Sequence, residues 1–442
     1  MSATETPTTS AVRTQHLLSD LFGSFDQGDF AIRLWDGSQW RPRSSNGKPS
    51  FTMVLNHPGS LRRMFERPSM LSLGEAFLAR NVDIEGDLLA ACELGDHLLR
   101  LKPSIVKKAK LALELRRLPA APQSTEGRPP ASLSGRLGSR RRLREAISYH
   151  YDLPSEFWKE WLDTTLAYSC AYFKTDADSL DQAQLNKLDY VCRKLYLKPG
   201  ERLLDLGCGW GGLAMFAAKN YGVNVTAITL SKKQFEYASG EVAKRGLENQ
   251  VSIQHLDFRD YRNAELFDKI SCVGAVEHVP EVDLPAFFAH ASSLLKPGGL
   301  FFNHGITASS VRLHPSGPSF VDAYVFPDHG VTTISQQLAA AEEMEFEVRD
   351  VECLREHYMR TCGEWLKRIE EHEEALIRHS NVGTQRLFRL YVAAQMYYFR
   401  TGASSIHQAL FVKSNRKPSQ LPLTRAAWYG GGPSGDRSAT NA

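Results

Sequence analysis

The sequence of 442 residues predicts an α/β fold, in which a doubly wound sheet follows a smaller N-terminal α+β domain. Three observations predict it. From residue 200 onward, apolar runs typical of strands alternate with amphipathic runs typical of helices. A glycine-rich segment, LLDLGCGWGG at 203–212, ends the first of these strands. Before it, the stretch 119–140 is dense in Pro, Gly and Ser, which favours a linker between two domains.

The part of the chain before this linker is predicted to be small and mixed. Residues 1–15 are polar and rich in Thr, and we interpret them as a disordered leader. Residues 16–118 then form the α+β domain. Its expected elements are strands at 30–35 and 51–56 and helices at 60–66, 74–80 and 87–117.

The larger domain is expected to span 141–416, and a disordered tail to cover 417–442. Its expected strands are 202–206, 224–230, 251–256, 267–275, 300–306, 345–354 and 407–413. Its expected helices are 212–221, 231–246, 284–296, 365–379 and 383–400. Seven strands with helices between them are enough for a complete doubly wound sheet.

Composition narrows the class of protein. Hydrophobic residues make up 42% of the chain and charged residues 23%, as in ordinary globular proteins. No run of 18 apolar residues occurs, and no apolar segment follows a basic start, so we expect a cytoplasmic protein. Seven cysteines without a CxxC pair argue against a disulfide framework or a zinc ribbon, and no metal site is expected.

Charge is unevenly distributed along the chain. The formal net charge is only +3, yet residues 100–144 hold thirteen Lys or Arg and two acidic residues. The rest of the chain is therefore acidic overall, which argues against a general nucleic-acid-binding surface. A local anionic partner of the basic segment is the interpretation that remains, beside that of a merely solvated linker and helix.

The glycine-rich segment indicates a cofactor loop. Gly207, Gly209 and Gly212 satisfy GxGxxG between a strand and a helix, where glycines let the backbone turn tightly and approach a ligand. Nicotinamide cofactors are bound by the same pattern. The fuller form DLGCGWG, with Asp205 two residues before the first glycine, looks like the loop of an S-adenosylmethionine-dependent methyltransferase. Asp205 can fix the loop or meet the amino-acid part of that cofactor.

The end of the second strand helps to separate these two cofactors. A dinucleotide-binding domain needs an acidic residue there for the ribose hydroxyls. This sequence has Thr229, Leu230 and Ser231 instead, which departs from the nicotinamide pattern and from most methyltransferases.

Four further strings give the sequence a specific resemblance. They are HYDLPSEFWKEWLD (150–163), TLAYSCAYF (165–173), ITLSKKQ (228–234) and VGAVEHVP (273–280). Together with the loop, they resemble the cyclopropane-fatty-acyl-phospholipid synthases and their mycolic-acid relatives, over about 145–413. The resemblance implies a Rossmann-like class I methyltransferase domain with a seven-stranded sheet. The smaller N-terminal domain matches the longer bacterial members.

The resemblance also implies a reaction. Members of the family transfer a methylene group from S-adenosylmethionine to the cis double bond of an acyl chain in a membrane phospholipid. An alkene is a poor nucleophile, so the reacting groups must be aligned in a dry pocket. Aromatic side chains, dense in YSCAYF and in MYYF at 396–399, can stabilise the carbocation that forms. The family is understood to use bound bicarbonate as the base that removes a proton before ring closure.

The site residues follow from the resemblance position by position. The bicarbonate cradle is carried over to Cys170, Glu277, His304, Ile306 and Tyr358, with Cys170 contributing through its backbone N–H as much as through its sulfur, and not as a nucleophile. The cofactor contacts are carried over to Tyr151, Tyr168, Ser169, Asp205, Gly207, Gly209, Thr229, Gln234, Phe258 and Arg259. Tyr151, Tyr168 and Ser169 are expected near the methionine part, Thr229 and Gln234 near the ribose, and Phe258 against the adenine with Arg259 beside it. The family shares Thr229 in place of the acidic ribose ligand.

The expected partner is the membrane. An enzyme that acts on acyl chains in a bilayer must reach the bilayer surface, and segment 100–144 is the candidate for binding an anionic leaflet at the inner face of the cytoplasmic membrane. The resemblance also suggests a homodimer. Alternatives are a methyl branch on the chain instead of a ring, methylation of another lipid or an amine, and a non-catalytic lipid-binding protein on the same fold.

Overall fold

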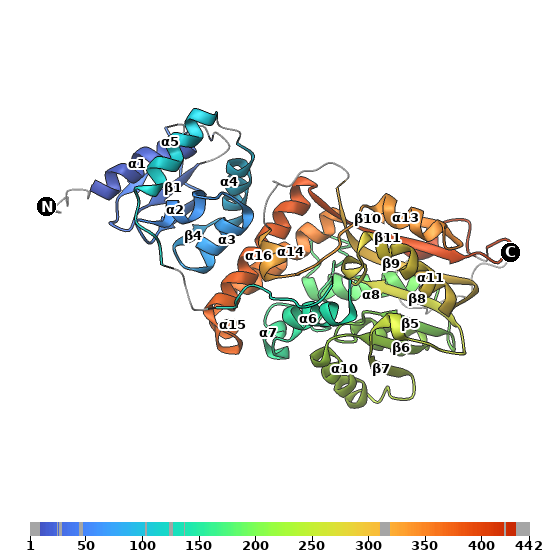
Figure 1. Cartoon of the computed structure of the whole chain (residues 1–442). Coiled ribbons are helices and arrows are strands. Elements are labelled where there is room, and N and C mark those ends of the chain that lie inside the picture. Colours follow the sequence, from blue (N-terminus) through green and yellow to red (C-terminus); the bar gives the residue numbers. More distant parts are fainter. Residues whose placement is uncertain are drawn as a thin grey trace. The chain divides into compact units, whose positions relative to one another are not determined.

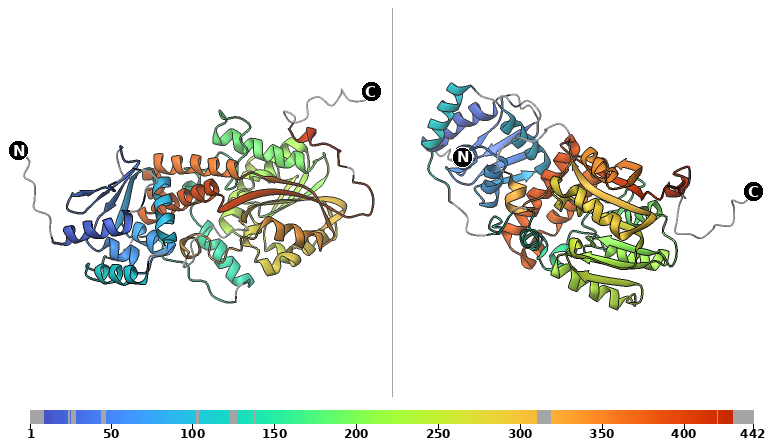
Figure 2. Two further views of the ribbon diagram at one scale, coloured as in Figure 1. Left: turned by 90° about the horizontal axis from the view of Figure 1, so that it is seen from above. Right: turned by 45° about the vertical axis from the view of Figure 1, so that its right-hand side comes forward.

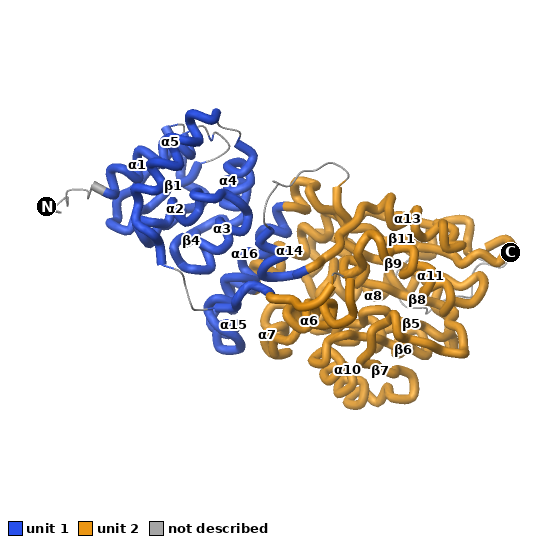
Figure 3. Tube along the Cα trace, in the orientation of Figure 1, with its two compact units in different colours: residues 1–131, 312–327, 369–397 blue, residues 132–311, 328–368, 398–442 orange. Residues whose placement is uncertain are grey.

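A computed structural model describes residues 9–23, 25, 29–43, 47–101, 104–122, 127–136, 138–309, 319–419 and 421–429. The chain forms two compact units, coloured separately in Figure 3. The first comprises Met1–Ala131, Arg312–Pro327 and Ile369–Tyr397, and the second comprises Ser132–Val311, Asp328–Arg368 and Tyr398–Ala442. The first unit thus includes two segments from the later half of the chain, which the sequence had placed in the larger domain.

The first unit contains a four-stranded sheet in the order β2-β1-β3-β4. The strands are β1 (Phe30–Arg33), β2 (Gln39–Trp40), β3 (Phe51–Leu55) and β4 (Val82–Gly86). The helices are α1 (Thr9–Phe22), α2 (Ser60–Phe65), α3 (Met70–Leu78), α4 (Leu88–Arg100), α5 (Ile105–Arg116), α12 (Phe320–Tyr324), α15 (Glu373–His379) and most of α16 (Val382–Thr401). The expected α+β character is present, although β2 and β4 are too short and too polar to be recognised from the sequence.

Two predictions in this unit are wrong. The leader does not extend to residue 15, because α1 begins at Thr9. Leu17, Leu18 and Phe22 give that helix a buried apolar face, and the Phe22 ring lies 6.0 Å from Phe30 of the sheet. The single helix expected over 87–117 is two helices, since α4 ends at Arg100 and the Ser104 side chain caps the start of α5. Residues 1–8 of the predicted leader lie outside the described residues.

The second unit contains a seven-stranded sheet in the order β10-β11-β9-β8-β5-β6-β7, which confirms the predicted doubly wound fold. Its strands are β5 (Arg202–Leu206), β6 (Asn224–Thr229), β7 (Val251–His255), β8 (Phe267–Val273), β9 (Leu295–Ala308), β10 (Phe346–Cys353) and β11 (Ser404–Lys413). Strands β5 to β9 are parallel to their neighbours in this set, while β11 runs antiparallel to both β9 and β10.

Helices cover both faces of this sheet (Figures 1 and 2). They are α6 (Arg140–Tyr151), α7 (Ser155–Lys159), α8 (Leu180–Lys194), α9 (Gly212–Tyr221), α10 (Lys232–Lys244), α11 (Leu284–Leu294), α13 (Ile334–Glu342), most of α14 (Arg355–Glu371) and α17 (Ala426–Tyr429), with short 3₁₀ turns at Phe258–Asp260, Val276–His278 and Glu281–Asp283. One apolar core lies between the sheet and α8 and α9, and a second lies between the sheet and α11 and α13. Because β5 is buried on both sides, the residues at its end are held rigidly.

The tail is a third correction. Residues 417–442 are not disordered throughout, because α17 forms at Ala426–Tyr429 and its Trp428 side chain is 6% exposed. Trp428 packs into the apolar core beside α8. Residues 420 and 430–442 lie outside the described part. Among the described residues, no helix combines the length and the apolar character needed to span a bilayer.

Candidate active site

The glycine-rich loop joins β5 to α9 at the carboxyl end of the sheet. Gly207, Gly209 and Gly211 all adopt positive φ angles, of 78°, 55° and 83°, which L side chains rarely allow. A Cβ on Gly207 would also lie 2.6 Å from the Ala275 side chain. The loop therefore requires glycines for its conformation and, at Gly207, for space, and it leads directly into the N-terminus of α9.

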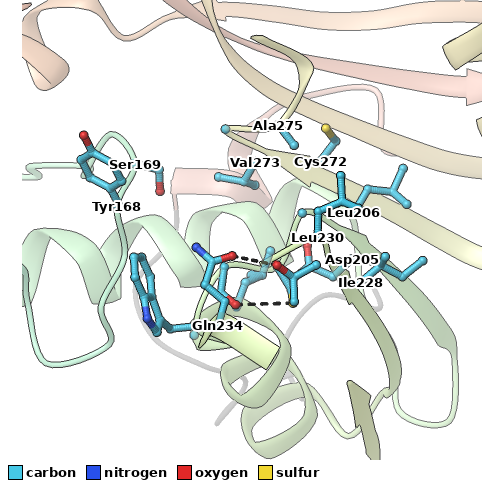
Figure 4. A pocket seen from close by; sticks show the side chains of 18 of the residues that line it. Tyr168, Ser169, Asp205, Leu206, Ile228, Leu230, Gln234, Cys272, Val273 and Ala275 are labelled. Carbon is cyan, nitrogen blue, oxygen red and sulfur yellow. Dashed lines mark hydrogen bonds between the residues drawn. The ribbon is translucent and has the colours of Figure 1, made fainter. Parts of the chain in front are cut away.

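A cavity lies over this loop (Figure 4). Its lining contains nine of the ten residues predicted to contact the cofactor: Tyr151, Tyr168, Ser169, Asp205, Gly207, Gly209, Thr229, Gln234 and Phe258. These residues come from α6, the segment before α8, the end of β5 and the loop after it, the end of β6, the first turn of α10 (Lys232–Lys244) and the turn that follows β7. The structure thus gathers residues more than 100 positions apart at the edge of the sheet where doubly wound folds bind ligands.

Arg259 is the tenth predicted contact, and it does not line the cavity. Its guanidinium binds the buried Asp257 carboxylate, with 2.6 Å between Nη2 and Oδ2, and its Nη1 donates to the carbonyl of Gly138. Phe258 lines the cavity from the same short turn. The Asp257 carboxylate thus holds the Arg259 side chain, and the expected place of Arg259 beside the adenine stays a prediction.

Thr229 and Gln234 form one hydrogen-bonded corner of the cavity. The Thr229 hydroxyl donates to Gln234 Oε1 at 2.7 Å, and it accepts from the Ser231 backbone N–H at 3.2 Å. Ser231 in turn caps α10 by accepting from the Gln234 backbone N–H. Within the described residues, the amide nitrogen of Gln234 makes no hydrogen bond, so it can donate to a hydroxyl group such as those of a ribose.

The loop 163–171 forms another wall of the cavity. The Asp163 carboxylate accepts from the backbone N–H groups of Thr165 and Ala167, and Leu166 between them has a φ of 53°. From α8, Gln184 Nε2 donates to the carbonyls of Ala167 and Ser169. Lys187 Nζ donates to the Ser169 hydroxyl at 2.9 Å. Buried polar side chains therefore fix a loop that has no regular secondary structure.

The predicted bicarbonate cradle does not line this cavity but forms a connected cluster of its own. The Ile306 N–H on β9 donates to Glu277 Oε1 at 2.7 Å, and Ile306 pairs with Ile406 of β11. The carbonyl of Ile406 accepts from the N–H of Leu354. The Leu354 carbonyl then accepts from the Cys170 thiol at 3.8 Å.

Tyr358 and His304 complete this cluster. Tyr358 follows Leu354 by one helical turn, and its N–H donates to the Leu354 carbonyl at 3.0 Å. His304 lies two residues before Ile306 on β9, so its side chain points to the same face of the sheet. The five residues predicted from distant strings are thus brought together by β9, β11 and the start of α14.

Glu277 and His304 have the electrostatic character of proton-handling groups. Burial raises the pKa of Glu277 to about 7, against the lowering effect of the Ile306 N–H. Burial also lowers the pKa of His304 well below its ordinary value, and the charges of Lys187 and Lys194 add to this. Among the described residues, Glu277 Oε2 and His304 Nε2 have no hydrogen-bond partner. Each of these two buried atoms is thus left with hydrogen-bonding capacity that the described residues do not use.

Cys170 is held as a neutral thiol. It is 0% exposed, burial raises the pKa of its thiol well above the ordinary value, and the thiol donates to the carbonyls of Ala171 and Leu354. A neutral donor thiol is a poor nucleophile. This agrees with the prediction that Cys170 is not a covalent catalyst.

Aromatic rings connect the cavity with the cluster. Tyr151 and Tyr168 line the cavity, and their ring centroids lie 6.3 Å apart. Tyr168 is followed by Trp365 at 5.3 Å and Trp365 by Tyr358 at 5.9 Å. Phe399, from the MYYF string, lies 4.5 Å from Tyr358. The two aromatic strings noted in the sequence therefore end in one continuous aromatic wall.

Lys187 is the main cavity residue that sequence reasoning missed. It lines the cavity, it is 3% exposed, and it lies in the middle of α8. The sequence around it, QLNKLDY, resembles any amphipathic helix, in which a lysine is expected to face solvent. Only its spacing of three residues from Gln184 could have suggested that both side chains point at the same loop.

The chain is similar to known proteins over most of its length. The family described as mycolic acid cyclopropane synthetase matches residues 138–409, and a domain of unknown function matches residues 17–107. A probable fatty acid methyltransferase of Pseudomonas putida is 38% identical over 404 residues, which cover 90% of this chain and 95% of that protein. The chain belongs to the mycolic acid cyclopropane synthetase family.

Other relatives agree. The cyclopropane-fatty-acyl-phospholipid synthase of Escherichia coli K12 is 34% identical, over 62% of this chain and 69% of that enzyme. The solved cyclopropane synthase MmaA2 of Mycobacterium tuberculosis gives a TM-score of 0.59 at 29% identity, over 61% of this chain and 98% of that one. A mycolic acid cyclopropane synthase crystallised with SAH and CTAB gives 0.58 at 30% identity, with the same coverage. The chain is therefore an S-adenosylmethionine-dependent methyltransferase of this family.

Proposed function

We propose that this enzyme transfers a methylene group from S-adenosylmethionine to the cis double bond of acyl chains in membrane phospholipids, with bicarbonate as the base. The observation that carries the proposal is the pairing of the cavity with the Glu277 cluster through loop 163–171. Ser169 lines the cavity, and the next residue, Cys170, belongs to the cluster. A simple N- or O-methyltransferase has no need of a second buried site for an anion beside its cofactor.

The residues present fit both groups. When bound, S-adenosylmethionine supplies an electrophilic methyl group and bicarbonate supplies a proton acceptor. Gly207, Ser169 and Thr229 would hold the first, and the unpartnered atoms of Glu277 and His304 would orient the second. Near neutral pH, a carboxyl whose pKa is about 7 can stay protonated and donate to an anion, which removes the repulsion that a carboxylate would cause.

The aromatic wall supports the same chemistry. Methyl addition to an alkene leaves a positive charge on the acyl chain, and that charge must be kept from water until the ring closes. The rings of Tyr168, Trp365 and Tyr358 are apolar and present π faces that attract a cation. They exclude water and stabilise the charge between the methyl donor and the base.

Product analysis tests the proposal. The protein is incubated with S-adenosylmethionine, bicarbonate and vesicles of cis-unsaturated phospholipid, and the acyl chains are analysed by mass and by ring-specific fragmentation. We expect an addition of one CH₂ per modified chain, held in a ring. Turnover should fall when bicarbonate is removed from the buffer and return when it is restored.

A methyl branch is the second candidate, because two relatives are named probable fatty acid methyltransferases. A saturated, methyl-branched product would contradict ring formation and support this second candidate. Binding of S-adenosylmethionine without turnover on any unsaturated lipid would favour the non-catalytic alternative and contradict both.

As a further check, Glu277→Gln should lower turnover far more than affinity for S-adenosylhomocysteine, and equal losses would contradict its role at the base.

We also propose that the enzyme meets the membrane through α5, one part of the basic segment predicted from the sequence. Three of the four arginines of α6 are already paired within the second unit. Arg140 pairs with Asp260 at 2.6 Å, Arg141 with Glu145 at 2.9 Å, and Arg142 with Asp328. In α5, by contrast, Lys107, Lys108 and Arg116 are exposed and form no ion pair within the described residues.

The outward face of α5 is apolar. At about 100° per residue, one face collects Ile105, Val106, Ala109, Ala112 and Leu113, with the exposed Arg116 at its C-terminal end. Ile105 is 86% exposed, Val106 81% and Leu113 55%, while Leu115 on the opposite face is buried. An exposed apolar stripe flanked by lysines is the pattern of a helix that lies in the surface of an anionic bilayer.

Vesicle sedimentation tests this contact. Ile105→Ser with Val106→Ser should weaken binding to vesicles that contain anionic phospholipid, and so should Lys107→Ala with Lys108→Ala, by roughly tenfold or more at about 1 kcal/mol per lysine. Arg141→Ala, which removes a paired cation, is the matched control and should bind as the unaltered protein does. Unchanged vesicle binding with a loss of self-association would instead assign the stripe to a second copy of the chain.

A further inference from the structure

Lys187 presents a buried positive charge that none of the roles assigned above uses. Its side chain is 3% exposed and lines the cofactor cavity. Its Nζ donates to one neutral acceptor, the Ser169 hydroxyl, at 2.9 Å. Within the described part of the chain, it forms no ion pair with a carboxylate. By comparison, Lys194, seven residues later on the same helix, pairs with Asp350 at 3.0 Å.

A buried ammonium group such as that of Lys187 is stabilised by a nearby anion. Removing such a group from water costs several kcal/mol unless a partner of opposite charge compensates. Burial accordingly lowers the pKa of Lys187, while Asp163 and Asp205 favour its charged form from a distance. The Asp163 carboxylate is already occupied by the donors of loop 163–171. An anionic group on the occupant of the cavity would supply the direct ion pair that Lys187 lacks within the described residues.

Asp205 is the complementary observation. It lines the same cavity and is 2% exposed, and only its Oδ1 has a partner, the Ser271 hydroxyl at 2.8 Å. Its Oδ2 has none among the described residues. One cavity is thus lined by a buried cation and a buried anion, neither of which forms a direct ion pair within the described residues. A ligand that carries both a carboxylate and an ammonium group, as an α-amino acid does, would satisfy both.

We propose that Lys187 binds the α-carboxylate at the amino-acid end of the cofactor, opposite Asp205, which meets the α-ammonium group. The inference rests on the proposed function for the identity of that cofactor. Lys187 is a binding residue and also a positioning residue, because the same ammonium holds the Ser169 hydroxyl. It thereby sets the loop that separates the cavity from the Glu277 cluster.

Bicarbonate is the other carboxylate-like anion that Lys187 could attract. The position of Lys187 favours the cofactor. It lines the cavity together with Gly207 and Ser169, whereas Glu277 and His304 do not line that cavity. Lys187 reaches His304 only as a charge that lowers the pKa of that imidazole.

Calorimetry on the full-length protein, without lipid, tests the proposal with three ligands. S-adenosylhomocysteine carries the carboxylate, its decarboxylated analogue lacks only that group, and 5′-methylthioadenosine lacks the whole amino-acid end. In the unaltered protein, loss of the carboxylate should weaken binding roughly tenfold or more, the range expected for a hydrogen bond to a charged group. Lys187→Met should weaken S-adenosylhomocysteine by a similar factor and leave 5′-methylthioadenosine unchanged, and Lys187→Arg should restore part of the loss.

Several outcomes would overturn this role. Equal affinity of the unaltered protein for S-adenosylhomocysteine and its decarboxylated analogue does so without any variant. Equal weakening of all three ligands by Lys187→Met would indicate a structural effect on the loop. A raised bicarbonate requirement with unchanged S-adenosylhomocysteine affinity would assign Lys187 to the base. Lys174→Met, on an exposed lysine, is the control. Failure of ring formation on lipid, with these affinities as expected, would contradict the proposed function but not this inference.

Discussion

Asp205 shows how one residue can hold two roles at once. Its Oδ1 fixes the end of β5 against Ser271 of β8, and its Oδ2 remains open to the cavity. Burial raises the pKa of Asp205 to about 6, and the Ser271 hydroxyl and Lys187 act in the opposite direction. The ionised carboxylate of Asp205 would bind the ammonium group of the ligand. Burial in the folded protein disfavours this ionised form.

The pH dependence of Asp205 gives a residue-scale prediction. Because its folded pKa lies above the ordinary value of 3.8, the stability that it contributes is complete at low pH and is lost as pH rises through about 6. Asp205→Asn should remove this step, which amounts to up to about 3 kcal/mol of unfolding free energy for a shift of this size. Affinity for S-adenosylhomocysteine should change in the opposite sense, falling below pH 6 in the unaltered protein only.

Denaturant unfolding and calorimetry between pH 4 and pH 8 would check both trends. Lys174→Met serves as the exposed control. Parallel pH curves for the unaltered protein and Asp205→Asn would remove Asp205 from this account.

The sequence alone could place a residue at the cavity when that residue lies at a strand end or in a loop of fixed shape. Thr229 and Gly207 reach the cavity because the end of a parallel strand has one possible location. Arg259 and Lys187 could not be placed in this way. Their positions depend on which partner captures a long side chain, Asp257 in one case and Ser169 in the other, and that choice is made by tertiary packing.

At the scale of single elements, the four-residue helix α17 lies beside the buried ion pairs of Lys194. Lys194 is 1% exposed and pairs with Asp350 and Glu352. The Trp428 ring lies 5.4 Å from the Lys194 ammonium, and the Tyr190 ring lies 4.8 Å from it. Trp428 therefore both fills the core beside α8 and keeps water from the pair.

Trp428→Ala should lower the unfolding free energy by about 3 kcal/mol or more, because it opens a cavity next to a buried charge. Thermal or denaturant unfolding measures the loss. Leu423→Ala, at a fully exposed position in the same segment, is the control and should change the free energy little. A loss below about 1 kcal/mol for Trp428→Ala would mean that α17 does not hold this position in solution. The composition of the tail could not predict α17, because Trp428 is the one buried side chain of this helix.

For the molecule as a whole, the predicted linker does contain a boundary, since the chain passes from the first unit to the second between Ala131 and Ser132, but the chain crosses between the units again later. The first unit is completed by 312–327 and 369–397. Phe320 packs so closely on α3 that a Cβ on Gly74 would lie 2.2 Å from its ring. Arg386 stacks on Phe77 at 4.1 Å and pairs with Asp83, and the Tyr397 hydroxyl donates to Asp96 at 2.8 Å. Such long-range contacts leave no local sign in a sequence, so a contiguous domain was the natural expectation.

Truncation tests this organisation. A fragment of residues 132–442 should unfold at a lower temperature than the full chain and should show fast amide hydrogen exchange in 369–397, because this segment loses the partners of Arg386 and Tyr397. In the full chain, Arg386→Gln should raise exchange in the same segment. Arg378→Gln, on an exposed arginine of α15, should not. Equal protection of the 369–397 amides from exchange in the fragment and in the full chain would mean that the second unit and this segment are independent of residues 1–131.

The succession of Ser169 and Cys170 has a consequence for how this enzyme can vary. Ser169 borders the cavity and Cys170 belongs to the Glu277 cluster, so a single peptide bond, with about 3.8 Å between Cα atoms, links the two. A displacement of the backbone at this point is therefore passed to both. A substitution that shifts loop 163–171 should for this reason alter the cavity and the cluster together.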